Sequence, residues 1–181
     1  MATKVLPSPE VLRQLLRYEP DTGRLFWLPR PVEMFSSPGS CLSWNSKHSG
    51  RPALATEDGN GYVSGLVFGT RFRAHRVAWA VQTGEWPADE IDHIDGNRGN
   101  NRFANLRAAN RSQNNQNVRR SKANTSGVKG VHWYKQRRKW QAYIQVAKKN
   151  ITLGYFDSIE AAAAKVAQAR AQYHGEFGRS A

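Results

Sequence analysis

Residues that could carry out chemistry are concentrated between Glu90 and Asn117, a stretch rich in Asn, Asp and Arg. His93 accepts a proton near neutral pH without a shifted pKa. Asp92 directly precedes it, and Asn114 follows in an expected helix. A carboxylate and an amide oxygen form an incomplete set of hard ligands, which suits a magnesium-like cation that keeps several waters and takes a substrate phosphate oxygen. With His93 as general base, these residue types point to metal-assisted hydrolysis of a phosphodiester.

The pattern around these residues predicts a strand, a loop, a short strand and a helix. Ile91 and Ile94 flank the Asp-His pair, and a Gly- and Asn-rich turn follows over residues 95–101. Side chains of consecutive strand residues point to opposite faces, so a bend or bulge is needed to bring Asp92 and His93 to one site. The unit is too polar to form a core and too short to fold alone, so neighbouring elements must support it.

The phrase IDHIDGN, followed by NN and NLR, resembles the HNH nuclease motif in the Asp-His-Asn form common in phage and homing endonucleases. The resemblance implies a ββα-metal core in which Asp92 binds the metal and His93 activates water. It implies that Asn105 holds the loop through backbone hydrogen bonds and that Asn114 completes the metal site. The implied cofactor is a divalent metal, Mg²⁺ with Mn²⁺ as a substitute.

Other interpretations of this stretch stay open. Asn115 and Asn117 lie close enough to Asn114 to be the second metal ligand instead. Asp-Gly-Asn alone is typical of a surface loop, because these residues tolerate turn geometry. A lone His beside an Asp is more often a structural hydrogen bond than a catalytic base. Together with the spacing, the residues favour the nuclease.

The charge balance indicates a nucleic-acid partner. The chain has 181 residues and a net charge of +13, from 27 Lys and Arg against 14 Asp and Glu. No acidic residue lies between Asp95 and Asp157, and an uncompensated basic run of this length suggests contact with phosphates. The single Cys41 excludes an internal disulfide and favours a reducing compartment. Without a long apolar run, neither a membrane nor secretion is expected.

The N-terminal part is expected to be scaffold. Ser8-Pro9-Glu10 predicts a helix start, and residues 18–27 a hairpin. Residues 29–60 have weak periodicity and many Pro, Ser and Gly, so irregular structure is expected. A second hairpin turning at Gly69-Thr70 and a helix over 75–83 ended by Gly84 then lead into the motif. His75, at the start of that helix, is expected to be structural or to contact phosphate.

The C-terminal part predicts three short strands and one helix. Residues 131–134, 139–146 and 151–156 are the strands, and alternation over 139–146 places Trp140, Ala142 and Ile144 on one face. Asp157 and Glu160 form a capping-box-like pair at the start of the helix.

The sequence Gly-Val-x-Gly-Val-x-Trp opens this part, and Leu-Gly-Tyr-Phe precedes the helix. With these motifs, the chain over about residues 124–177 resembles the Apetala-type DNA-binding domain of plant ethylene-response factors. In that family the sheet enters the major groove. By position, the resemblance implies DNA contacts at Trp133, Lys135, Arg137, Arg138, Trp140, Gln141 and Lys148, although Trp140 fits the core equally well.

The sequence therefore predicts an α+β protein: a ββα-metal HNH core and a small three-stranded antiparallel sheet packed on one helix. The expected domains are a scaffold with an irregular segment (1–60), the nuclease (61–118), a basic linker (119–126) and the DNA-binding module (127–178). Further DNA contacts are expected at Arg98, Arg102, Arg107, Arg119, Arg120 and Lys122.

The expected function is a metal-dependent DNA endonuclease, homing-endonuclease-like and nicking one strand. It would act on double-stranded DNA as a monomer or homodimer, with no membrane and no small-molecule substrate. The phage-like motif implies a phage-encoded protein in the cytoplasm of a bacterial host cell. The alternative is a catalytically silent, sequence-specific DNA-binding regulator.

Overall fold

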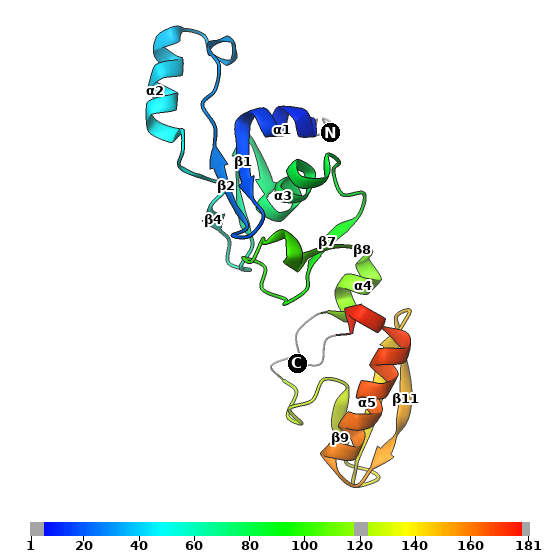
Figure 1. Ribbon diagram of the computed structural model, residues 1–181. Helices are drawn as coiled ribbons and strands as arrows, with labels where there is room; N and C mark the ends of the chain where they lie inside the picture. Colours follow the sequence, from blue (N-terminus) through cyan, green and yellow to red (C-terminus); the bar gives the residue numbers. More distant parts are fainter. Residues whose placement is uncertain (1–5, 118–122, 179–181) are drawn as a thin grey trace, which may run out of the picture. The chain divides into compact units, whose positions relative to one another are not determined.

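The computed structural model describes residues 6–117 and 123–178, and it divides into two compact units, Met1–Ala108 and Ala109–Ala181 (Figure 1). Small antiparallel sheets alternate with helices, so the α+β fold class is confirmed. In the described part of the chain no helix is long and apolar enough to cross a membrane.

The first unit opens with α1 (Pro9–Leu15), which begins as the sequence predicts. Ser8 Oγ accepts a hydrogen bond from Val11 N, and the helix buries Leu12 and Leu15. The strands β1 (Leu16–Glu19) and β2 (Arg24–Trp27) form the predicted hairpin, and β3 (Pro52–Ala53) pairs with β2.

The segment after the hairpin is more ordered than the sequence predicts. A short 3-10 turn, η1 (Val32–Met34), is followed by an eleven-residue helix, α2 (Pro38–His48), with Ser37 as its N-cap. No residue of α2 is buried, which explains why no apolar stripe revealed it. Trp44 anchors it through an edge contact with Trp27 and the Arg30 guanidinium 3.9 Å from its ring centroid.

A second small sheet and a helix complete the support. The strands β4 (Thr56–Glu57), β5 (Val63–Val67) and β6 (Thr70–Arg73) pair in sequence order. Phe68 and Gly69 are the two turn residues between β5 and β6, one position earlier than predicted, and both have positive φ. The helix α3 (Ala74–Thr83) ends at Gly84 in the left-handed region, as predicted.

The motif follows as β7 (Glu90–His93), a loop, the 3-10 turn η2 (Phe103–Asn105), β8 (Leu106–Ala109) and α4 (Arg111–Gln116). The predicted order of strand, loop, strand and helix is confirmed, and β7 pairs with β8. One hydrophobic core extends from Leu12 on α1 to Leu106 on β8. The predicted boundary at residue 60 therefore has no counterpart in the packing, because both sides of it share that core.

Gly23 shows how the hairpin supports the motif loop. It has φ +74°, and a Cβ at this position would lie 2.4 Å from the carbonyl carbon of Asn101 and 2.5 Å from Arg102 N. Tyr18 OH donates to Asn101 O at 2.7 Å, and Phe103 N donates to Pro20 O at 3.0 Å. The β1–β2 hairpin thus holds the backbone of residues 101–103, about eighty positions away.

Gly23→Ala should destabilise the first unit. A left-handed Ala costs roughly 1–2 kcal/mol, and relieving the clash adds roughly 1–3 kcal/mol. Gly69→Ala is the matched control, because Gly69 has φ +72° and nothing within 4 Å of the added Cβ. Urea unfolding of both variants measures the difference. Equal losses would show that the close approach to Asn101 contributes nothing.

The second unit contains the predicted sheet of three strands, β9 (Val131–Tyr134), β10 (Lys139–Val146) and β11 (Lys149–Phe156), with α5 (Ile159–Tyr173) and the turn η3 (Gly175–Phe177). Its core consists of Val131 and Ala142 on the sheet and Ala162 and Val166 on α5, which packs against that face of the sheet. The predicted capping pair is wrong: Ser158 is the N-cap of α5, and its Oγ accepts from Ala161 N.

Candidate active site

His93 ends β7 in a buried position, only 4% exposed. Its Nε2 lies 3.1 Å from Asn101 Oδ1, and because an amide oxygen only accepts, Nε2–H is the donor. The backbone oxygen of Asn101 accepts a hydrogen bond from Tyr18 OH on the β1–β2 hairpin. The arrangement leaves Nδ1 as the basic nitrogen of His93.

The electrostatics around His93 favour the neutral imidazole. Burial lowers its pKa, while the hydrogen bond with Asn101 and the carboxylates of Asp95 and Asp92 act in the opposite direction. A neutral imidazole is the form that a general base needs.

Two aromatic rings pack on His93. The His75 ring lies edge-on, with centroids 5.0 Å apart, and the Tyr62 ring centroid is 6.2 Å away. Tyr62 in turn lies under the guanidinium groups of Arg73 and Arg98, at 4.4 and 4.8 Å from its ring centroid. His93 therefore sits in a rigid, largely apolar setting bordered by two cations.

His75 is a second buried imidazole, 6% exposed, and its Nδ1 has no hydrogen-bond partner. Burial, followed by the charges of His93, Arg76 and Arg73, lowers its pKa to about 3. A structural role, which the sequence left open beside phosphate contact, fits this burial.

Stability should therefore fall in acid because of His75. The unfolded chain takes up a proton below its ordinary pKa of 6.5, whereas the folded chain resists protonation down to about 3. The contribution is fully present above pH 6.5 and is lost as pH falls through that window. Between pH 7 and pH 5 wild type should lose about 2 kcal/mol more than His75→Phe. Urea unfolding at both pH values tests this, and His48→Phe should keep the wild-type dependence.

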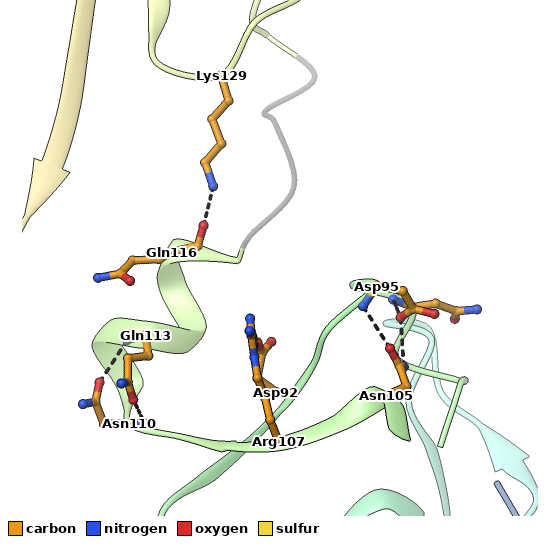
Figure 2. Close-up of polar contacts among 9 residues, drawn as sticks. Asp92, Asp95, Asn105, Arg107, Asn110, Gln113, Gln116 and Lys129 are labelled. Atoms are coloured by element: carbon orange, nitrogen blue, oxygen red, sulfur yellow. Dashed lines mark hydrogen bonds and ion pairs between the residues drawn. The ribbon is translucent and has the colours of Figure 1, made fainter. Parts of the chain in front are cut away.

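Asp92 is paired with Arg107, whereas His93 is hydrogen-bonded to Asn101. Asp92 is 4% exposed, and its Oδ2 accepts from Arg107 Nε at 2.9 Å and from Arg107 Nη2 at 2.7 Å (Figure 2). The Arg107 side chain is itself only 13% exposed. The predicted phosphate clamp at Arg107 therefore does not fit, because its guanidinium is buried against the carboxylate on the neighbouring strand.

The Asn105 side chain hydrogen-bonds to residues at both ends of the motif loop. Its Oδ1 accepts from Asp95 N at 3.0 Å, and its Nδ2 donates to Asp95 Oδ1 and to Asn100 O (Figure 2). Its backbone oxygen also accepts from Ile94 N. Although burial acts the other way, hydrogen bonds from Asn100, Asn97 and Asn105 hold the pKa of Asp95 below its ordinary value. Loss of the Asn105 amide would remove the partner of two backbone groups of the loop, Asp95 N and Asn100 O.

The fourth predicted site residue, Asn114, lies on α4 in the second unit. This helix begins with a capping box, in which Asn110 Oδ1 accepts from Gln113 N and Gln113 Oε1 accepts from Asn110 N (Figure 2). Asn114 is half-buried. Within the described residues no group of three or more His, Cys, Asp or Glu could hold a metal. The oxygen donors Asp92 and Asn114 fit a hard cation chemically, since such an ion completes its shell with waters and substrate oxygens.

The predicted DNA contacts fall in different environments. Arg98 and Arg102 are exposed on the motif loop. Arg119, Arg120 and Lys122 lie outside the described residues. Exposed positions in the β9–β10 and β10–β11 turns hold Lys135, Arg137, Arg138 and Lys148.

The two predicted DNA-contacting tryptophans, Trp133 and Trp140, lie on the side of the sheet that α5 covers. Trp140 packs against the core on the α5 side, and Trp133, 43% exposed, lies against it at 5.1 Å between centroids. Gln141 lies on the other face, where its Nε2 donates to Thr152 Oγ1 and Tyr155 OH. Trp140 is thus half-buried on the face that α5 covers.

Asn101 and Tyr62 are the site residues that the sequence did not single out. Asn101 is one of many Asn in its loop, and nothing in the local pattern separates it from its exposed neighbours. Tyr62 belongs to a different hairpin. Only their burial beside His93 identifies them.

A family model of HNH endonucleases matches residues 72–116, from β6 to the end of α4. The chain thus carries an HNH endonuclease domain, and His93 with its loop lies within the matched stretch. Protein 3.8 of Escherichia phage T7 is 36% identical over 108 residues, which cover 59% of this chain and 88% of the phage protein. The chain belongs to the family of this phage protein.

A solved structure on DNA binding and cleavage by the HNH homing endonuclease I-HmuI is also similar. Its TM-score is 0.39 at 18% identity, and the match covers 89% of this chain and 82% of the other. So weak a structural likeness adds nothing to the family assignment.

Proposed function

We propose that this protein is a metal-dependent DNA endonuclease that hydrolyses phosphodiester bonds through its HNH domain. The observation that carries the proposal is the buried, neutral His93, oriented by Asn101 and adjacent in sequence to the buried carboxylate of Asp92. With Nε2 as the donor, Nδ1 is the unprotonated nitrogen, which is the form that a general base needs.

In the proposed reaction, His93 Nδ1 takes a proton from the attacking water. Asn101 accepts from Nε2–H and keeps the ring in one tautomer and orientation. Asn105 keeps the loop closed, so that the hydrogen bond between Asn101 and His93 is maintained. The exposed Arg98 and Arg102 contact phosphates on either side of the bond that breaks.

Asp92 and Asn114 are the residues proposed to hold the divalent metal, Mg²⁺ or Mn²⁺. A bound cation of this kind stabilises negative charge on the scissile phosphate and the leaving oxygen. Arg107 orients the Asp92 carboxylate within the protein through two hydrogen bonds to Oδ2.

The second unit is proposed to add DNA affinity as an Apetala-type module. The sheet face that α5 leaves open carries Gln141, Tyr143 and Tyr155, with the Arg137 guanidinium 4.3 Å from the Tyr155 ring centroid. Amide, phenol and guanidinium groups on a sheet face suit groove and phosphate contacts. A tethered second module raises the effective concentration of DNA at the nuclease.

One observation favours a second candidate, a regulator that binds DNA without cutting it. The Asp92 carboxylate already has a bidentate cationic partner in Arg107, which competes with a metal for Oδ2.

Relaxation of supercoiled plasmid separates the two candidates. The endonuclease should give open-circle product with magnesium or manganese and none with chelator. Because each chain holds one His93 site, nicking should precede any linear product. A folded protein that binds phage DNA in the presence of magnesium or manganese but does not cleave it would support the regulator instead.

A further inference from the structure

The second unit contains a cleft of about 840 Å³. Its walls come from α4, the loop before β9, the β10–β11 end of the sheet and the last turn of α5. A cleft of this size is large enough for a segment of a polymer or a small ligand.

The charges in this cleft all have one sign. Its charged lining residues are Arg111, Lys129, Lys148 and Arg170, with no Asp or Glu among them. Ser, Asn and Gln side chains provide most of the remaining polar lining. A concave surface with uncompensated positive charge concentrates an anionic ligand.

Two of these cations build the walls. Lys129 Nζ donates to Gln116 O at 2.8 Å and thereby connects α4 to the loop before β9 (Figure 2). Arg170 is 8% exposed, and its Nη2 donates to Lys129 O. A buried guanidinium held by a neutral carbonyl keeps its full charge beside the cleft.

The other two cations are exposed. Lys148 is in the β10–β11 turn with φ +66°, a conformation that costs free energy for a residue with a Cβ. Arg111 occupies the first turn of α4, where a positive charge is disfavoured by the helix dipole. The positive φ of Lys148 is the conformation that the two-residue turn after Val146 requires. Both side chains are exposed and line the cleft, so a ligand can reach them.

The cleft uses one face of α4. Arg111, Ser112, Asn115 and Gln116 line it, while Asn114 does not. In an α-helix the positions i, i+1, i+4 and i+5 share a face, so the proposed metal ligand lies outside the lined face. The same helix can therefore carry a metal ligand and a phosphate-binding surface.

We propose that this cleft binds the phosphodiester backbone of DNA as a sequence-independent site. The proposal rests on the proposed endonuclease function, because that function supplies DNA as the polyanion. Arg111 and Lys148 contact the phosphates, and Lys129 and Arg170 maintain the positive wall behind them.

The test is the salt dependence of duplex DNA binding by the full chain in chelator, which prevents cleavage. Fluorescence anisotropy is measured across a salt series for wild type, Arg111→Gln and Lys148→Gln. Lys165→Gln is the matched control, since Lys165 is exposed in the same unit but does not line the cleft. Circular dichroism checks that each variant is folded.

Each cleft variant should bind several-fold more weakly, equally on unrelated duplexes, and should reduce the slope of log K against log salt by about 0.9. Arg111→Gln is decisive, because Arg111 does not belong to the sheet. If both cleft variants match Lys165→Gln while wild type binds DNA, the cleft proposal is overturned and the proposed function stands. If wild type does not bind duplex DNA at any salt, both proposals fail together.

Discussion

His93→Ala should reduce DNA cleavage by roughly 10²- to 10⁴-fold, the range that a positioned general base contributes. The ring is buried, and its Nε2 donates to Asn101, so the substitution removes the oriented Nδ1 that is proposed to act as the base. Binding to the same DNA should change little, because the exposed cations that contact phosphates are unaffected. Single-turnover cleavage in magnesium and anisotropy in chelator measure the two quantities.

His48→Ala is the control for this experiment, since His48 lies on α2 beside Trp44 and far in sequence from the motif. It should cut at the wild-type rate. A His93→Ala protein that cuts as fast as wild type, in the same metal, would remove His93 from the mechanism.

Arg107→Ala should destabilise the fold by about 3–5 kcal/mol, because it leaves the Asp92 carboxylate buried without its cation. Arg17→Ala is the comparison: it breaks an ion pair with Glu19 whose side chains are 54% and 32% exposed, so the loss should be much smaller because solvent screens the pair. Urea unfolding in chelator measures both values.

The Asp92 environment also allows a test of the metal. If Asp92 binds a divalent cation, magnesium should stabilise Arg107→Ala more than it stabilises wild type, because the ion replaces the missing positive charge. Adding Asp92→Asn to Arg107→Ala should abolish this difference. Equal losses for Arg107→Ala and Arg17→Ala would show that the buried pair has no special role.

Much of the candidate site could be read from local sequence. The Asp-His pair, the Gly- and Asn-rich turn and Asn-Leu-Arg predict a strand, loop, strand and helix, and these elements form. The resemblance to the HNH motif implied that Asn105 holds the loop, and its Oδ1 accepts from Asp95 N. The β10 alternation likewise placed Ala142 and Ile144 in the core.

Other features depended on residues far apart in the chain. Tyr18 contacts Asn101 across 83 positions, and Gly23 touches the same loop through backbone atoms. No local pattern encodes such contacts, because Asn101 has the same composition around it as its exposed neighbours. For the same reason, the pairing of Arg107 with Asp92 could not be distinguished in advance from a phosphate contact.

By itself, the sequence determined which residues are chemically able to act and which short elements carry them, because propensity, capping and alternation are local properties. The tertiary structure decided their surroundings. In the tertiary structure His93 is buried against Asn101 and His75, Asp92 forms an ion pair with Arg107, and Trp140 packs on the α5 side of the sheet. Burial and pairing arise from packing between distant segments, and they set the protonation state of His93 and the charge partner of Asp92.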